Sequence, residues 1–237
     1  MARRKINPFL DVPDMYIIDQ HNKGKKIPRD GLIGEWLSSG NSNDTSGNGN
    51  HGTIHLATLT IDRKSAPNSA YNFASTGASI EIINNAIFQL GTGDFSSSFW
   101  VKFDTQSVLR WCMSFDNNAS SIGHNYALIN TNGNKLRFNI RGANGGSIYS
   151  NSALNDNVWH HVVCIRNSGT LTMYVDNILQ IETLSGVTES VSQVDRNYAF
   201  GNYRYQNNLY YMRGDYDDIR IYDRVLLTSE ISTIYNE

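Results

Sequence analysis

The sequence predicts an all-β domain of two packed antiparallel sheets, preceded by an extended N-terminal arm and followed by a short helix. The composition, with 13 Tyr, 19 Gly and 4 Pro in 237 residues, suits short strands and polar turns better than long helices. Short β-type segments also recur along the chain with turn residues between them. Sandwiches of this length commonly form one unit, so one domain after the arm is expected.

Residues 1–30 are the predicted arm. They hold three of the four prolines and seven Lys or Arg against four Asp, without strand or helix periodicity. The apolar run from Met15 to Ile18 is its one candidate strand or anchoring segment. The globular domain is expected from Gly31 to residue 237. The candidate contacts of the arm with an assembly are Arg3, Arg4, Lys5, Phe9 and Tyr16.

After the arm, segments of strand length alternate with polar turns, which implies two sheets. The predicted strands are 32–37, 70–73, 79–83, 95–103, 108–115, 126–130, 135–140, 159–166, 170–175, 178–182, 198–201 and 216–222. Asp176 and Asn177 both tolerate positive φ, so a two-residue type I′ turn is expected between 170–175 and 178–182. Residues 228–235 predict a short helix, with Thr228 or Ser229 as N-cap and Glu230 in its first turn.

Charge and cysteine content narrow the function classes. Residues 1–30 carry a net charge of +3, which leaves −5 for the rest of the chain. A mildly acidic body argues against a nucleic-acid-binding surface. Cys112 and Cys164 lie in apolar strands and are expected to be small buried hydrophobic residues, although a disulfide between them remains open.

Targeting signals are not evident. The basic start is followed by a broken apolar segment, not by the continuous one of a secretory signal. No run approaches the roughly 18 apolar residues of a membrane helix, so no membrane insertion is expected. If Met1 is the native N-terminus, the protein is expected to fold in the cytoplasm of the cell that makes it.

Four motifs follow one another in an order that is more specific than any of them alone. They are 31–37 (GLIGEWL) with 43–53 (NDTSGNGNHGT), 95–103 (FSSSFWVKF), 159–163 (WHHVV) with 169–177 (GTLTMYVDN), and 214–226 (GDYDDIRIYDRVL) with 230–231. Together they resemble the laminin G-like jelly roll of the concanavalin A-like lectin/glucanase superfamily, over about residues 31–236. The resemblance implies a jelly-roll sandwich. One departure is Asn177, where the family has Gly, and Asn can adopt the same left-handed backbone.

Catalytic residues are not apparent. Some members of the resembling superfamily are glycosidases, which need two carboxylates across the scissile bond. The sequence has no E-x-D-x-E strand, G-x-S-x-G elbow, P-loop or H-E-x-x-H motif, so we assign no catalytic residue and expect no enzyme. His160 and His161 are adjacent on a strand and point to opposite faces, which predicts one packed and one exposed imidazole and no shared metal ion.

Calcium is the inorganic candidate, since it binds carboxylate, amide and carbonyl oxygens of loops and the segment from Asp44 to Asn50 offers all three. Strict alternation along the closing strand places Asp217 on the face of Ile219, where an acid needs a partner. The resemblance places these two segments near each other, and calcium is common in that family. The candidate ligands are Asp44, Asn48, Asn50 and Asp217. An Asx-turn at Asp44 and a hydrogen-bonded Asp217 are an equally weighted alternative.

A sugar site combines aromatic platforms with amide and guanidinium groups, and segment 202–211 has this composition. Its candidate glycan-binding residues are Tyr203, Arg204, Tyr205, Asn207 and Tyr210. The alternative, which we weight more, is a polar hairpin whose tyrosines cover the sheet, because Tyr is common in strands.

Two classes of function fit this organisation. The favoured one is a non-catalytic structural or adhesion protein of a larger assembly, a bacteriophage virion protein for capsid decoration or in the tail. It would be made in the host cytoplasm, bind other subunits through residues 1–30 and display a lectin-like jelly roll, with surface glycans as further partners. The alternative is a bacterial carbohydrate-binding module, secreted or at the cell surface. A glycoside hydrolase is the least favoured.

Overall fold

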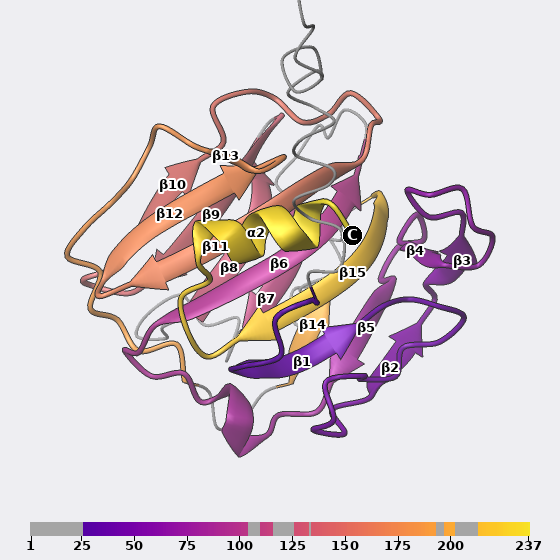
Figure 1. Ribbon diagram of the computed structural model, residues 1–237, viewed down its shortest axis with the longest axis horizontal. Coiled ribbons are helices and arrows are strands. Elements are labelled where there is room, and N and C mark those ends of the chain that lie inside the picture. The colour runs from indigo at the N-terminus through magenta and orange to yellow at the C-terminus, as the bar shows by residue number, and fades with distance from the viewer. Residues whose placement is uncertain (1–25, 104–109, 116–125, 133, 193–196, 202–212) are drawn as a thin grey trace, which may run out of the picture.

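The computed structural model describes residues 26–103, 110–115, 126–132, 134–192, 197–201 and 213–237. In these ranges the chain forms two stacked antiparallel sheets with one α-helix against the outside of the first (Figure 1). The two-sheet all-β sandwich predicted from the sequence is confirmed. No helix in the described part is long and apolar enough to cross a membrane.

Sheet A has the strand order β13-β12-β11-β6-β15-β4-β3, and β1 pairs with β15 beside this path. Its strands are β1 (Leu32–Trp36), β3 (Thr58–Thr60), β4 (Ala70–Asn72), β6 (Phe95–Lys102), β11 (His160–Asn167), β12 (Thr170–Val175), β13 (Ile178–Leu179) and β15 (Asp215–Tyr222).

Sheet B has the order β10-β9-β8-β7-β14-β5-β2. Its strands are β2 (Gly52–His55), β5 (Ser79–Ile82), β7 (Arg110–Phe115), β8 (Tyr126–Asn132), β9 (Lys135–Arg141), β10 (Gly146–Tyr149) and β14 (Tyr198–Phe200). The sequence did not predict β2, β3, β10 or the 3₁₀ helix η1 (Ala86–Phe88).

The hairpin between β12 and β13 has the predicted turn. Asp176 and Asn177 have φ of 49° and 64°, as a type I′ turn requires, and Val175 lies opposite Ile178. Asn177 thus adopts the left-handed conformation expected where the resembling family has Gly.

The main core lies between the two sheets. Phe95 of β6 and Phe138 of β9 meet edge to face with ring centroids 6.1 Å apart, which joins the inner faces of sheets A and B. Cys112 and Cys164 are both fully buried in this core, and both are free thiols. Burial raises the pKa of the Cys112 thiol to about 12, so it remains protonated and packs as a small apolar side chain.

A second, smaller core lies on the outer face of sheet A, under helix α2 (Thr228–Tyr235). Ile231 and Ile234 of the helix pack there with Val163 of β11 and Tyr222 of β15. The helix has the predicted bounds, but the prediction that Thr228 or Ser229 is its N-cap is wrong. The N-cap is Leu227, whose backbone N–H donates to the Glu230 carboxylate over 2.8 Å.

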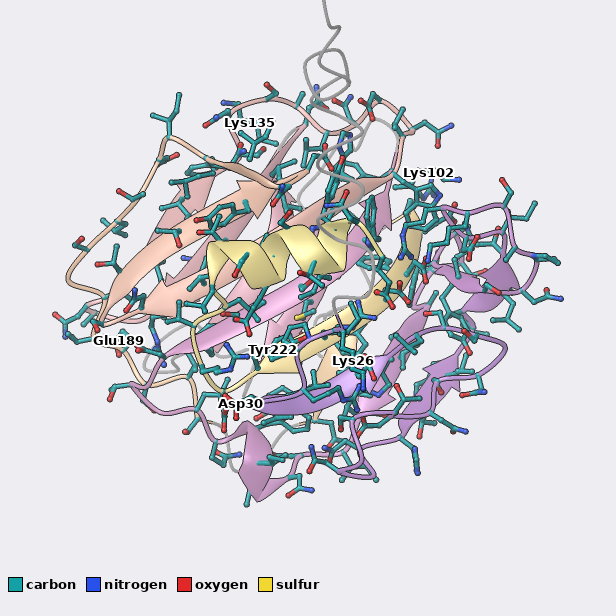
Figure 2. All side chains as sticks on the ribbon, viewed as in Figure 1. Lys26, Asp30, Lys102, Lys135, Glu189 and Tyr222 are labelled. Carbon is teal, nitrogen blue, oxygen red and sulfur yellow. The ribbon has the colours of Figure 1, made fainter. Side chains whose placement is uncertain are left out.

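Residues 27–30 contact the domain. Ile27 packs against the core under α2, and the Tyr222 hydroxyl donates to the Pro28 carbonyl over 3.2 Å. Figure 2 shows Tyr222 beside this entering stretch of chain, which runs from Lys26 to Asp30. The arm residues Arg3, Arg4, Lys5, Phe9 and Tyr16 lie outside the described residues.

A β-bulge in β15 corrects the predicted direction of Asp217. The pairing of β15 with β6 shifts between Asp217 and Arg220, and Asp218 has φ of 46°. Tyr216 and Ile219 therefore both face the main core, while Asp217 lies over the outer face. The prediction that Asp217 shares a face with Ile219 is wrong, because strict alternation does not allow for the extra residue.

The bulge precedes a buried ion-pair network on the outer face of sheet A. Arg220 lies opposite Glu35 of β1 in register and binds it over 2.9 Å, and it binds Glu237 over 2.7 Å. Arg29 binds the other carboxylate oxygen of Glu35 over 2.6 Å. Although burial acts to raise it, the hydrogen bonds from Arg220, Thr45 and Arg29 lower the pKa of Glu35. This network holds β1 and the chain end on sheet A.

Replacing Arg220 tests the network. Arg220→Met should lower the free energy of unfolding in urea by about 3 kcal/mol, because it leaves the buried carboxylate of Glu35 without its main partner. The double variant Glu35→Leu/Arg220→Met should recover part of this loss, since no buried charge is then uncompensated. Lys135→Met, at an exposed position, is the control. An Arg220→Met protein as stable as this control would contradict the account.

Candidate binding site

Three polar residues lie side by side at one end of sheet A because of the strand register. Asp215, the first residue of β15, is opposite Asn72 of β4 on one side and Lys102 of β6 on the other. The neighbouring residues Tyr71 and Tyr216 belong to the main core. Alternation along the strands therefore directs the polar row away from the core.

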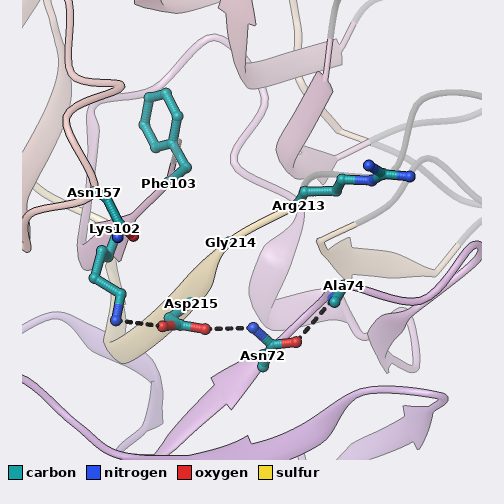
Figure 3. Close-up of a pocket in the computed structure, with 8 residues that line it drawn as sticks. All are labelled: Asn72, Ala74, Lys102, Phe103, Asn157, Arg213, Gly214 and Asp215. Carbon is teal, nitrogen blue, oxygen red and sulfur yellow. Dashed lines mark hydrogen bonds and ion pairs between the residues drawn. The ribbon is translucent and has the colours of Figure 1, made fainter. Parts of the chain in front are cut away.

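A pocket of about 250 Å³ opens at this row (Figure 3). It is lined by Asn72, Ala74, Lys102, Phe103, Asn157, Arg213, Gly214 and Asp215. Gly214 is fixed by its carbonyl, which accepts from the Phe73 N–H over 2.9 Å. Asn157 donates its backbone N–H to the Phe103 carbonyl over 3.0 Å. The walls thus come from strand ends and from short segments tied to them.

The polar row of the pocket is pre-organised. Lys102 Nζ lies 2.7 Å from Asp215 Oδ2, and Asn72 Nδ2 donates to Asp215 Oδ1 over 2.6 Å. Asn72 Oδ1 in turn accepts from the Ala74 N–H over 3.0 Å. Lys102 also lies over the ring of Trp159, 5.4 Å from its centroid. Since each oxygen of Asp215 contacts one of these neighbours, this carboxylate holds Lys102 and Asn72 in place.

The pocket offers donors and amide groups to a ligand. Asp215 is the one carboxylate among its lining residues, so the paired acids of a glycosidase do not meet there. Asn157 and Arg213 are exposed at the rim, where an incoming polar ligand would meet them. Such a combination of apolar residues and fixed polar groups is typical of a binding site for a small molecule.

Sequence reasoning did not select these residues. Lys102 and Asp215 are part of the motifs at 95–103 and 214–226. Asp215 follows Gly214, and a charged residue beside a motif glycine at a strand end could have indicated it. Asn72 and Asn157 have no such signal. The predicted glycan-binding residues Tyr203, Arg204, Tyr205, Asn207 and Tyr210 lie outside the described residues. They belong to the segment that leads directly into Arg213 of the pocket.

The loop proposed for calcium is closed by its own hydrogen bonds. Asp44 accepts from the N–H groups of Glu35 and Ser46 at Oδ1, over 3.0 and 2.8 Å, and from that of Asn50 at Oδ2, over 2.9 Å. The bond from Ser46 makes the Asx-turn that the sequence offered as the alternative. The side-chain amides of Asn48 and Asn50 donate to backbone carbonyls of β1. The loop thereby fastens β1 to the domain.

Asp217 makes its contacts with residues outside this loop. Its carboxylate binds Arg63 over 2.6 Å, and Asp218 binds the same guanidinium over 2.6 Å. Arg63 also lies 4.8 Å from the ring centroid of Trp100. The structure therefore does not join Asp217 to Asp44 in one ligand set. No group of three or more His, Cys, Asp or Glu in the described ranges could hold a metal ion, and calcium binding stays a prediction.

Of the two adjacent histidines, His161 is packed as expected, whereas His160 is only partly exposed and not the exposed imidazole that was predicted. His161 is fully buried, bonded to Ser98 over 2.9 Å and packed on the Trp100 ring at 5.1 Å. Burial lowers the pKa of His161 to about 3, so it is neutral. His160 is partly exposed and binds Asp176 over 2.7 Å and Asp156 over 3.1 Å, and the bond to Asp176 raises its pKa.

The acid pair at the bulge predicts an unusual pH dependence. Burial, together with the adjacent charge of Asp218, raises the pKa of Asp217 to about 7. Between its ordinary pKa of 3.8 and about 7, the folded state holds a proton that the unfolded state has released. This group therefore makes the free energy of unfolding fall as pH rises through that window, by up to about 1.4 kcal/mol per pH unit.

Asp217→Asn should remove this decline, so that the variant gains stability relative to the parent between pH 4 and pH 7. His161→Gln tests a group whose pKa is lowered, for which the change of stability with pH has the opposite sign. The low pKa of His161 makes stability fall as pH drops below 6.5, and the variant should lose that acid-side decline. Urea unfolding at several pH values measures both. Curves for Asp217→Asn that run parallel to those of the parent would refute the assignment.

Solved structures similar to this one include the binding domain of Paraclostridial Mosquitocidal Protein 1, at 17% identity and a TM-score of 0.67 over 87% of this chain and 52% of that one. The Botulinum neurotoxin serotype D binding domain has 17% identity and a TM-score of 0.64 over 87% and 51%. A Botulinum neurotoxin DC binding domain, solved in complex with rat synaptotagmin II, has 18% and 0.64 over 89% and 52%. This chain spans about half the length of these chains, and the likeness shows the fold.

The sequence comparison identifies the family. A search of curated proteins finds no match. The family model described as the concanavalin A-like lectin/glucanases superfamily matches residues 74–232, which is more than half of the chain. This stretch includes three of the four motifs found above, and the jelly-roll sandwich agrees with it. The chain therefore belongs to the concanavalin A-like lectin/glucanases superfamily.

Proposed function

We propose that the protein is a non-catalytic adhesion protein that binds a surface glycan through the pocket at the end of sheet A. In this proposal residues 1–30 attach it to a larger assembly, for which we favour a bacteriophage virion. The observation that carries the binding role is the polar row of Asn72, Asp215 and Lys102, fixed before any ligand arrives. Pre-organised groups lose little conformational entropy when a ligand binds.

Several features of the pocket favour a sugar over an apolar ligand. Lys102 retains N–H groups beyond the one directed at Asp215, and Asn157 presents an amide at the rim. Sugar hydroxyls both donate to and accept from such groups. Phe103 supplies an apolar surface in the lining, and Trp159 lies beside Lys102. The similar solved structures are those of binding domains, which is consistent with a binding role for this fold.

Hydrolysis of the sugar is the less favoured function. A glycosidase needs one carboxylic acid that can give up a proton and a second carboxylate across the bond. Asp215 is engaged at both oxygens, and the other lining residues are not acids. The second candidate we retain is a secreted or cell-surface carbohydrate-binding module, which would use the same pocket without needing the arm.

Binding can be tested with a glycan array followed by calorimetry on any glycan retained. Asn157→Gly and Arg213→Ala each remove a rim group, and Gly adopts the φ of 59° at position 157 without strain. Each should weaken binding at least tenfold, which is about 1.4 kcal/mol. Lys135→Ala on β9, away from Lys102 in Figure 2, is the matched control and should bind normally. Undiminished binding by both rim variants would exclude this pocket.

Attachment to an assembly needs a separate experiment. A chain lacking residues 2–25 keeps Ile27, Pro28 and Arg29, whose contacts hold the start of the domain. We expect it to unfold at the temperature of the parent but to be missing from particles produced in an infected host. The parent and the control Lys135→Ala should both be incorporated. Normal incorporation of the truncated chain would exclude the arm as the anchor and favour the free-standing module.

A further inference from the structure

Both sheets end on the same side of the sandwich in a short edge strand. β3 is the last strand of sheet A and β2 is the last strand of sheet B, and the two lie close together at one side of the molecule (Figure 1). They are joined by Leu56 and Ala57. Within the described ranges, no other strand pairs with the outer side of β2 or β3. On the outer side of β2, the N–H and C=O of Gly52 already bond to Ser42, over 2.8 and 2.6 Å. The outward N–H and C=O groups of β3 have no strand partner in the described ranges and can pair with another chain.

This double edge is also apolar. Ile54, Leu56, Leu59 and Ile61 are exposed by 43%, 66%, 36% and 56%. Residues 52–61 contain no Asp, Glu, Lys or Arg. Charged side chains and proline, two of the devices that protect natural edge strands, are absent here, and the short length of the strands is the one such device present. Four exposed aliphatic side chains within eight residues on such edges are typical of an interaction surface.

The backbone holds Leu56 outward. Leu56 has φ of 54°, a left-handed conformation that is unfavourable for a bulky side chain, and the next residue, Ala57, packs against the main core. A polar Asn or a Gly would relieve this strain at an exposed corner. Strain of this kind that is retained at a surface position indicates that the exposed side chain has a use.

The opposite edge of sheet B, at β10, is not open, because other segments of the chain cover it. The carboxylate of Glu182 accepts from the N–H of Tyr149 in β10 over 3.1 Å, and Leu184 packs over Gly146 of the same strand. Glu189 accepts from the N–H of Asn144 over 2.6 Å. This side of sheet B is thus closed within the chain, whereas in the described ranges no strand pairs with the outer side of β3.

We propose that a second copy of this chain pairs with the double edge about a two-fold axis perpendicular to the sheets. β3 then runs antiparallel to β3 of the second copy, and sheet A continues across the dimer. Two-fold pairing brings this edge against the same edge of the second copy, so like charges on it would meet and repel. An edge of ten residues without a charged side chain avoids this repulsion. The proposal rests on the sheet edges and not on the glycan pocket.

The oligomeric state tests the proposal. By sedimentation velocity over a concentration series, the full chain should be a dimer at about 10 µM, the low end of stable association. The double variant Leu56→Lys/Ile61→Lys should raise the dimer dissociation constant at least tenfold and keep the circular dichroism spectrum of the parent. Ile181→Lys adds the same charge at a position exposed by 87% elsewhere and should stay dimeric. A monomeric parent at 100 µM, or equal weakening by Ile181→Lys, would overturn the proposal.

Cross-linking tests the register directly. Thr58→Cys, Leu59→Cys and Thr60→Cys each place a thiol on β3, and the two natural cysteines are fully buried. Opposite residues of an antiparallel pair have the Cα separation that a disulfide needs. At least one of the three should form a covalent dimer on mild oxidation, whereas Ile181→Cys should not. If none of the three cross-links more than Ile181→Cys does, the strand-to-strand pairing is refuted.

Discussion

The arrangement of this domain depends on one extra residue in its central strand. β15 pairs with β6 and β4 along its sides and with β1, and every one of its residues is buried. Without the bulge at Asp218, Asp217 would share the core face with Ile219, and a carboxylate would lie between the sheets. With it, Tyr216 and Ile219 face the core and Asp217 meets Arg63 outside. This change of face requires a positive φ at Asp218, which is an unfavourable backbone conformation for a residue other than Gly.

The bulge also explains why the outer face of sheet A is charged yet covered. Arg63 reaches β15 from the connection between β3 and β4, and it binds two adjacent acids while stacking on Trp100. The ring of Tyr235 in α2 stacks on the ring of Trp100, with 5.6 Å between the ring centroids. Since buried ion pairs gain little net stability over apolar packing, their contribution here is to specify position. They fix where the helix and the loop rest on the sheet.

The sequence was informative where structure is local. The turn at Asp176 and Asn177 follows from two residues that tolerate positive φ, and the extent of α2 follows from a short amphipathic segment. Its N-cap did not follow, because Glu230 bonds the Leu227 N–H and pairs with Arg224 in place of a Thr or Ser cap. The edge strands β2 and β3 were missed although residues 53–56 and 58–61 alternate between polar and aliphatic side chains, because each alternating run is only four residues long.

The candidate site was hidden for a related reason. Asn72 and Asp215 are 143 residues apart and meet through the register of β4 and β15, which no local pattern encodes. The bulge likewise has no signature, since Asp is only one of several residues that can adopt a left-handed backbone. The four motifs identified the fold, whereas the pairing of distant strands determined which polar side chains converge. Long-range register is the information that a single sequence does not supply.

The position of the pocket relative to the edge strand β3 bears on the proposed binding role. The polar row of Asn72, Asp215 and Lys102 points away from the core, toward the outer side of sheet A. A two-fold axis perpendicular to the sheets would keep the outer faces of both copies on the same side. Two pockets would then approach one surface together. Two linked sites of low individual affinity reach a much higher overall affinity in this arrangement, because the second binding event is intramolecular. If the pocket binds a surface glycan as proposed, pairing of the domain would therefore strengthen attachment to that surface.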